Sequence, residues 1–164
     1  MKWIFFSLLG LMICGCFGKK PKIKTGLEGK PMPAISILSA DGTTVVNTAD
    51  IRRGRPTLLF SFATWCSYCN AQTQSIVSHI STLKDMNIYM VCNTDFSEFK
   101  KFDSRYHLSK YPNIKAGVDT GFSFFKYFKS EQIPFLAIYD KRKILKQVLI
   151  GKTPISTIKE IALE

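Results

Sequence analysis

From about residue 34 onward, apolar and polar residues follow a regular pattern that is typical of secondary structure. Residues 34–38 (AISIL) and 43–46 (TTVV) flank the turn Ala40-Asp41-Gly42. An Asp-Gly pair supplies the positive φ that tight turns need, so we expect these two runs to form a β-hairpin. Residues 48–54 (TADIRRG) predict a short capped helical turn that ends at Gly54.

A strand and a helix follow the hairpin. Residues 56–62 (PTLLFSF) are apolar without alternation, which is typical of a strand covered on both faces. From Ser67 onward the period changes to that of a helix, and polar residues occupy its other face. The apolar positions at helical spacing are Ile76, Val77, Ile80 and Leu83.

The middle of the chain predicts another strand and two more helices. Residues 88–92 (IYMVC) have the character of a buried strand, and residues 96–108 have aromatic residues at helical spacing. In residues 120–130, Phe122, Phe125 and Phe128 fall on one helical stripe. A docking surface for partner peptides is one interpretation of this stripe, but apolar stripes usually pack inward, so we expect it in the core.

The C-terminal third predicts a second hairpin and a closing helix. Residues 134–140 and 144–151 are apolar runs joined by a turn at Asp140-Lys141, and residues 155–163 have helical periodicity. A strand-helix-strand unit requires a parallel crossover, whereas the last two strands pair antiparallel. The sequence therefore predicts an α/β sandwich with a mixed central sheet, helices on both faces and an N-terminal β-hairpin extension.

The first residues resemble an export signal. Residues 1–15 carry one Lys and a short apolar run, which is the layout of a signal peptide. The sequence Ile13-Cys14-Gly15-Cys16 resembles the lipobox of bacterial lipoproteins, in which the last Cys is acylated, so we expect lipidation of Cys16. A plain secretory signal and a short uncleaved anchor are the alternatives. All three place the domain outside the cytoplasm, on the periplasmic side of a bacterial membrane.

The charge is unevenly distributed. The formal net charge is +11, and residues 18–30 (GKKPKIKTGLEGK) are rich in Lys, Gly and Pro. We therefore expect a basic tether over residues 16–30 and one folded domain over residues 31–164. The tether suits anionic lipid headgroups, and a merely solvated linker is equally compatible. No basic stripe interleaved with stacking aromatic residues is present, so nucleic acid is not an expected partner.

Three cysteines remain once Cys14 and Cys16 are set aside with the N-terminus. Cys66 lies where a buried strand ends and a helix begins, so unpaired N–H groups and the positive end of the helix dipole favour its thiolate. Cys69 follows one helical turn later and can close a disulfide with it. The pair predicts a working dithiol.

Two other roles for the pair are less well supported. A zinc site needs about four ligands, and the chain has no second Cys-x-x-C, only Cys92, His79 and His107 at unrelated spacings. No metal is therefore expected. A purely structural disulfide between such close residues constrains the unfolded chain little.

These residues together carry a family resemblance. Residues 63–69 (ATWCSYC) follow an apolar strand, and Ile133-Pro134-Phe135 opens a later one. With Gly29-Lys30-Pro31, Asp41-Gly42 and Gly54-Arg55-Pro56 as the wider frame, the chain from residue 29 onward resembles the thioredoxin-like superfamily, in particular the membrane-anchored TlpA/ResA-like oxidoreductases. The resemblance implies a thioredoxin-like three-layer sandwich and no cofactor beyond the two thiols.

The resemblance also implies roles for individual residues. Cys66 is expected to be the exposed attacking thiol, Cys69 the shielded resolving thiol and Trp65 an aromatic wall beside them. Pro134 is expected to be a cis-proline facing the dithiol, with Ile133 offering backbone groups to a substrate strand. A trans-proline that opens an edge strand is the alternative.

The chain departs from the family at the buried acid. Many thioredoxins have Asp six residues before the first Cys, where this chain has Phe60. Anchored relatives take a Glu from the segment after the next strand, which makes Asp95 or Glu98 a candidate acid/base for Cys69. Acidic residues at such positions are more often helix N-terminal caps or dipole partners. We expect Cys92 to be a buried small hydrophobe and His107 to lie on a solvent-facing turn.

The predicted function is that of an exported, lipid-anchored thiol-disulfide oxidoreductase. Its expected partners are protein disulfide substrates, including apocytochrome c by resemblance, and a membrane thiol donor. A peroxiredoxin-like peroxidase is one alternative, weakened because Ala63 stands where peroxiredoxins have Thr three residues before the Cys. A non-catalytic thioredoxin-fold binding module is another.

Overall fold

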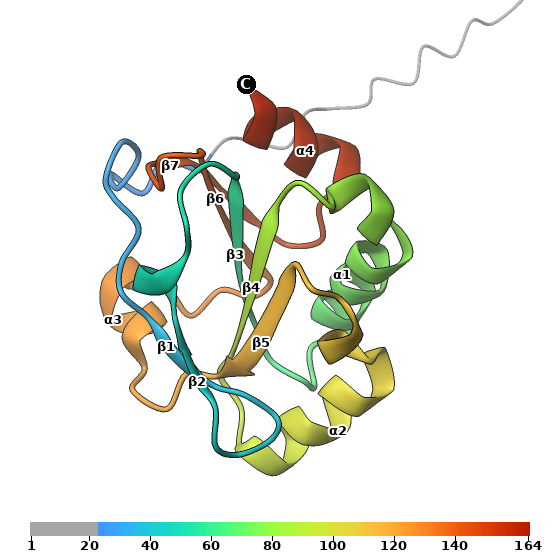
Figure 1. The fold of residues 1–164 in the computed structure, drawn as a ribbon. Coiled ribbons are helices and arrows are strands. Elements are labelled where there is room, and N and C mark those ends of the chain that lie inside the picture. Colours follow the sequence, from blue (N-terminus) through green and yellow to red (C-terminus); the bar gives the residue numbers. More distant parts are fainter. Residues whose placement is uncertain (1–22) are drawn as a thin grey trace, which may run out of the picture.

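The computed structural model describes residues 23–164 (Figure 1). The predicted signal peptide of residues 1–15 and the predicted lipidation of Cys16 fall outside these residues and stay predictions. Among the described residues, no helix is both long enough and apolar enough to cross a membrane.

One mixed sheet forms the centre of the molecule, with strand order β2-β1-β5-β4-β3-β6-β7. Its strands are β1 (Ser36–Leu38), β2 (Val45–Asn47), β3 (Thr57–Phe62), β4 (Asn87–Cys92), β5 (Ile114–Val118), β6 (Phe135–Tyr139) and β7 (Leu145–Ile150). Strands β3, β4 and β5 are parallel, and the remaining pairs are antiparallel. The mixed sheet and both hairpins were predicted correctly from the sequence.

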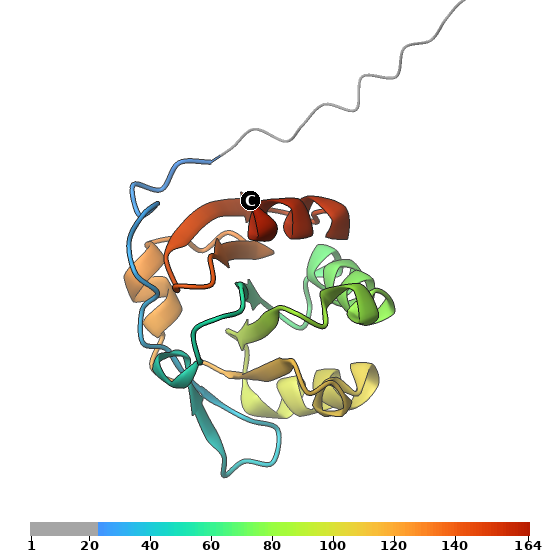
Figure 2. The ribbon, with the colours of Figure 1, turned by 45° about the horizontal axis from the view of Figure 1, so that its top comes forward.

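Helices cover both faces of the sheet. They are α1 (Ser67–Ser78), α2 (Phe96–Tyr106), α3 (Ser123–Phe128) and α4 (Ile155–Leu163), with 3-10 turns at Thr48–Asp50, Ile80–Leu83 and Leu108–Lys110. Figure 2 shows α1, α2 and α4 on one face and α3 on the other. The predicted turn of residues 48–54 is thus shorter than expected, and α1 ends at Ser78, leaving Ile80 and Leu83 in a separate 3-10 turn.

The central strand β3 fixes the position of the dithiol loop that follows it. All six of its residues are buried, and successive side chains point to opposite faces. Phe60 and Phe62 enter the core cluster shared with α1, α2 and α4, whereas Leu59 enters the cluster shared with α3. Such two-sided burial holds the carboxyl end of β3 rigidly, and the residues that follow it begin from a fixed point.

A row of aromatic rings connects that point to α2. The ring centroids of Phe60 and Phe62 are 5.4 Å apart, those of Phe62 and Phe102 4.8 Å, and those of Phe102 and Tyr106 4.7 Å. Ring pairs at such distances add to the free energy of burial. The row places the Tyr106 side chain of α2 close to the start of α1.

One strand was not predicted. Residues Ile114–Val118 form β5, which pairs parallel with β4 and antiparallel with β1. Lys115 and Gly117 interrupt its apolar pattern, which hides the strand from periodicity. The N-terminal hairpin consequently joins the main sheet through β5.

The expected core stripe of α3 was correct for Phe128 and wrong for Phe122 and Phe125. Phe122 and Phe125 are 62% and 44% exposed, and the buried residues are Phe124 and Phe128. The helix begins only at Ser123, because Phe122 adopts a left-handed backbone conformation with φ of 53°. Phe124 and Phe128, one helical turn apart, then face the sheet and pack on Phe135.

The predicted tether of residues 16–30 is shorter than expected at its C-terminal end. Ile23 forms a bridge with Val148 of β7, and Gly29 donates its N–H to the carbonyl of Leu145 at 2.8 Å. Pro31 forms a second bridge, with Ile144. Residues 23–31 therefore lie along β7 as part of the folded domain. Their Lys and Gly content gave no sign of this pairing.

Candidate active site

Cys66 occupies the junction between β3 and α1. It is the N-cap of α1, with extended backbone angles, and its Sγ accepts a hydrogen bond from the N–H of Cys69 at 3.1 Å. The first N–H groups of a helix have no partner within the helix, and the dipole is positive there. This position would favour a thiolate on Cys66 once the disulfide is reduced, and that effect stays a prediction.

Cys66 and Cys69 form a disulfide, with Cα atoms 5.2 Å apart. The prediction that the two sulfurs can bond within one helical turn is confirmed. Cys66 is only 7% exposed and Cys69 is fully buried. The expectation of an exposed Cys66 is therefore too strong, because the sulfur lies in the capping position against its own helix, although it is the more accessible of the two.

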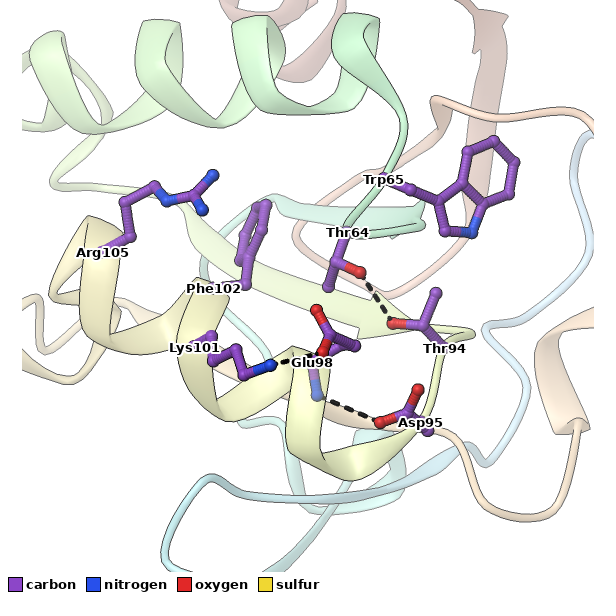
Figure 3. A pocket seen from close by; sticks show the side chains of 8 residues that line it. All are labelled: Thr64, Trp65, Thr94, Asp95, Glu98, Lys101, Phe102 and Arg105. Atoms are coloured by element: carbon purple, nitrogen blue, oxygen red, sulfur yellow. Dashed lines mark hydrogen bonds and ion pairs between the residues drawn. The ribbon is translucent and has the colours of Figure 1, made fainter.

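Two aromatic side chains next to the disulfide cysteines in the sequence are exposed to solvent. Trp65 is 76% exposed, and Tyr68 is also exposed. The side chain of Trp65 projects away from the loop into solvent (Figure 3). Large apolar groups exposed at a loop are available for contact with another chain.

The Ile133–Pro134 peptide bond is cis, as the resemblance implies. Pro134 directly precedes β6, whose residue Phe135 pairs with Ser61 of β3, so the proline lies at the sheet edge from which the dithiol loop departs. Pro134 is buried, and its carbonyl accepts the N–H of Gly151 at 2.8 Å.

Ile133 packs against the core cluster that contains both cysteines. Within residues 23–164 its backbone N–H and carbonyl make no hydrogen bond, and its role in binding a substrate strand stays a prediction.

Asp95 and Glu98 both line a cavity of about 410 Å³ next to the dithiol loop (Figure 3). Asp95 caps α2: its carboxylate accepts the N–H of Glu98 at 3.0 Å and the hydroxyl of Ser97 at 2.7 Å, and these bonds lower its pKa. Glu98 pairs with Lys101 at 2.7 Å. Neither carboxylate hydrogen-bonds to a cysteine among the described residues, so an acid/base role for them stays a hypothesis.

Several polar residues near the dithiol were not predicted. Thr64 and Thr94, which both line the cavity, share a hydrogen bond of 3.2 Å between their hydroxyls (Figure 3). Lys101 and Arg105 of α2 also line it. Asn70 contacts the loop directly. Its position immediately after Cys69 is the one signal that the sequence offered.

Cys92 and the two histidines do not line the cavity. Cys92 is buried, which raises the pKa of its thiol, and its sulfur lies 3.0 Å from the Thr94 hydroxyl. His79 ends α1, and His107 is exposed after α2. In the part of the chain that the structure describes, no three His, Cys, Asp or Glu side chains gather as metal ligands.

The family follows from a comparison with known protein families. The Redoxin family model matches residues 27–160. The chain belongs to the Redoxin family. With its paired Cys66 and Cys69, this redoxin is a thioredoxin-like thiol-disulfide oxidoreductase. No curated protein sequence matches it closely enough to count as a relative.

Solved structures share the fold of this redoxin at low sequence identity. The thioredoxin domain of a thiol-disulfide oxidoreductase from Bacteroides vulgatus is 18% identical, with a TM-score of 0.68 over 82% of this chain and 97% of that domain. The exposed lipoprotein thioredoxin Etrx1 of Streptococcus pneumoniae is 20% identical, with a TM-score of 0.62 over 78% and 99% of the two chains. A secreted Mycobacterium tuberculosis disulfide oxidoreductase, described as homologous to DsbE of E. coli, is 17% identical, with a TM-score of 0.61 over 77% and 90%. The thioredoxin-like fold expected from the sequence is thereby confirmed.

Proposed function

We propose that this redoxin is exported, anchored in a bacterial cell envelope through an acylated Cys16, and reduces or exchanges disulfides in other envelope proteins. The observation that carries the proposal is the Cys66–Cys69 disulfide at the start of α1, with the sulfur of Cys66 held against a helix N–H. Trp65 and the backbone of Ile133 supply contacts for a substrate chain on either side.

The reaction consists of two exchanges. The Cys66 thiolate attacks one sulfur of a substrate disulfide, that bond breaks, and the departing substrate sulfur takes up a proton. Cys69 then loses its proton and attacks the sulfur of Cys66, which forms the Cys66–Cys69 disulfide and releases the second substrate thiol. The substrate gains two electrons from the dithiol and two protons, which balance the proton that Cys69 loses and the proton that Cys66 released to solvent when it became a thiolate.

A further turnover requires a dithiol donor. A membrane protein with a reactive dithiol reverses the two exchanges and returns Cys66 and Cys69 to their thiol forms. Tethering to the same membrane raises the effective concentration of such a donor. Apocytochrome c, which must be reduced before haem attachment in the envelope, is a substrate suggested by the TlpA/ResA-like resemblance.

Export and anchoring rest on the sequence of residues 1–16 and on the names of similar structures. The segment Ile13-Cys14-Gly15-Cys16 resembles a lipobox. One similar structure is described as an exposed lipoprotein and another as secreted. Labelling of cells with a radioactive fatty acid tests the anchor: we expect label on the wild-type chain and none on Cys16→Ala.

A trapping experiment tests the catalytic proposal. The full chain with Cys69→Ser should accumulate mixed disulfides between Cys66 and envelope proteins, which appear as higher bands on non-reducing gels. Cys66→Ser serves as the control and should accumulate none. Trapping by neither variant, together with rapid peroxide consumption that depends on Cys66, supports a peroxidase. Partner capture that survives loss of both thiols supports a binding module.

A further inference from the structure

Asn70, the residue that follows Cys69, joins the dithiol loop to α2. Its side-chain Nδ2 donates hydrogen bonds to two backbone carbonyls, that of Thr64 at 3.0 Å and that of Cys66 at 2.8 Å. On its other side, the hydroxyl of Tyr106 lies 3.0 Å from Asn70 Oδ1. One amide thus bridges the loop on one side and a helix 36 residues further along the chain on the other.

The chemistry of these groups fixes the direction of every bond. A backbone carbonyl only accepts hydrogen bonds, so the NH₂ end of the amide must face the loop. Oδ1 then faces Tyr106, and because Oδ1 only accepts, the Tyr106 hydroxyl must donate. The side-chain amide therefore has a partner at both ends, and reversing it would place oxygen against the carbonyls of Thr64 and Cys66.

The two carbonyls lie on either side of Trp65. The Cys66 carbonyl also accepts the backbone N–H of Asn70 at 3.0 Å, which closes the first turn of α1. Together these bonds fix the backbone of residues 64–66 relative to the helix. This backbone determines where the Cys66 sulfur lies with respect to the N–H of Cys69.

We propose that Asn70, held by Tyr106, is a positioning residue that keeps the Cys66 sulfur at the N-terminus of α1 when the dithiol is reduced. The inference rests on the proposed function. In the oxidised protein the disulfide itself ties Cys66 to the helix. After reduction that tie is gone, and the hydrogen bonds of Asn70 are what hold the loop, so they stabilise the reduced form more than the oxidised form.

The proposal predicts the direction in which the dithiol–disulfide equilibrium shifts when the Asn70 amide is lost. A dithiol whose reduced form is stabilised is a stronger oxidant, and a well-placed thiolate has a lower pKa. Loss of the Asn70 amide should therefore raise the pKa of Cys66 and favour the disulfide. For Asn70→Ala we expect the equilibrium constant with glutathione to move about tenfold toward the disulfide, which corresponds to about 30 mV.

The experiment compares four full-length proteins: wild type, Asn70→Ala, Tyr106→Phe and Gln74→Ala. Tyr106→Phe removes only the hydroxyl, so the amide loses its anchor and we expect about a threefold shift in the same direction. Gln74 is the matched control, because it is an exposed amide of α1 whose side chain, among the residues that the structure describes, bonds only to Ser78. Each protein is equilibrated with oxidised and reduced glutathione, and Cys66 alkylation is followed against pH.

Shifts in both the equilibrium constant and the alkylation midpoint for Asn70→Ala and Tyr106→Phe, with Gln74→Ala unchanged, support the proposal. A fall in melting temperature with both midpoints unchanged overturns it, because Asn70 then serves stability alone. If Asn70→Ala does not fold, the same two measurements on Tyr106→Phe test the proposal: shifts in both support it, and unchanged midpoints overturn it. A wild-type protein that fails to exchange with glutathione contradicts the proposed function instead, which separates the two failures.

Discussion

The backbone N–H of Cys69 lies 3.1 Å from the sulfur of Cys66 and donates a hydrogen bond to it. The environments of the two cysteines therefore differ before any substrate binds. The sulfur of Cys66 lies at the positive end of the α1 dipole, whereas Cys69 is fully buried. The third thiol of the domain, Cys92, has no such environment, and its burial raises its pKa.

This inequality predicts a large difference in thiol reactivity. In the reduced protein we expect Cys66 to be alkylated with a midpoint below the value of about 8.5 for a free cysteine, because the thiolate is stabilised at the helix terminus. Cys92 should stay unmodified until the protein is denatured. Mass spectrometry after iodoacetamide treatment across a pH series measures both. Modification of Cys92 before Cys66 would contradict the assignment.

The exposure of Trp65 predicts a role in binding rather than in stability. Trp65→Ala should lower kcat/KM for a protein disulfide about tenfold, or about 1.4 kcal/mol, and leave the melting temperature unchanged. Reduction of a small synthetic disulfide should change little, since it makes few contacts beyond the sulfurs. Leu163→Ala, which truncates another exposed apolar residue, is the control. Equal losses on both substrates would argue against a binding role.

Adjacent residues of α3 should respond very differently to truncation. Phe124→Ala removes a buried ring that packs on Phe128 and Phe135, and should destabilise the protein by about 3–5 kcal/mol. Phe125→Ala removes a ring that is 44% exposed, and should change stability by much less, about 0.5 kcal/mol. Urea denaturation measures both variants. Similar losses would mean that α3 lies in a different phase from the one described.

Asp41 should contribute to acid sensitivity. Its carboxylate accepts the hydroxyl of Thr44 and the N–H groups of Thr43 and Thr44, which lowers its pKa to about 2. The unfolded chain binds the proton more tightly, so this stabilisation is present above about pH 4 and is lost as the pH falls toward 2. Asp41→Asn should therefore lose less stability than wild type between pH 5 and pH 2.5 in denaturant titrations.

Asp103 provides a control of opposite sign. Burial raises the pKa of its carboxyl, so its contribution grows as the pH falls through that pKa. Asp103→Asn should steepen the acid loss of stability rather than flatten it. An Asp41→Asn variant that follows the wild-type curve would show that the turn hydrogen bonds do not contribute.

The features predicted correctly from the sequence are those specified by nearby residues. The Asp41-Gly42 turn, the two hairpins and the capping position of Cys66 each depend on residues that are close together in the sequence. β5 was missed because part of its identity comes from a distant strand. A Cβ on Gly117 would lie 2.7 Å from the carbonyl oxygen of Leu38, so the glycine is required by the approach of β1 and not by a local turn.

The remaining errors have the same origin. The phase of α3 depends on where the helix begins, and one left-handed residue, Phe122, moves that point. Apart from its position after Cys69, Asn70 carried no recognisable signal, because its partner Tyr106 is supplied by another helix. The family resemblance named Asp95 and Glu98 as candidate acid/base residues, whereas their hydrogen bonds to Ser97 and Lys101 are seen only in the structure.

The pairing of residues 23–31 with β7 has a consequence for handling the protein. β7 is an edge strand of the sheet, so the N–H and carbonyl groups on its outer side can pair with another chain. The N-terminal segment bridges this row at Val148 and at Ile144. A shortened version starting at residue 33 would leave these groups of β7 unpaired, and we expect it to self-associate through them during purification.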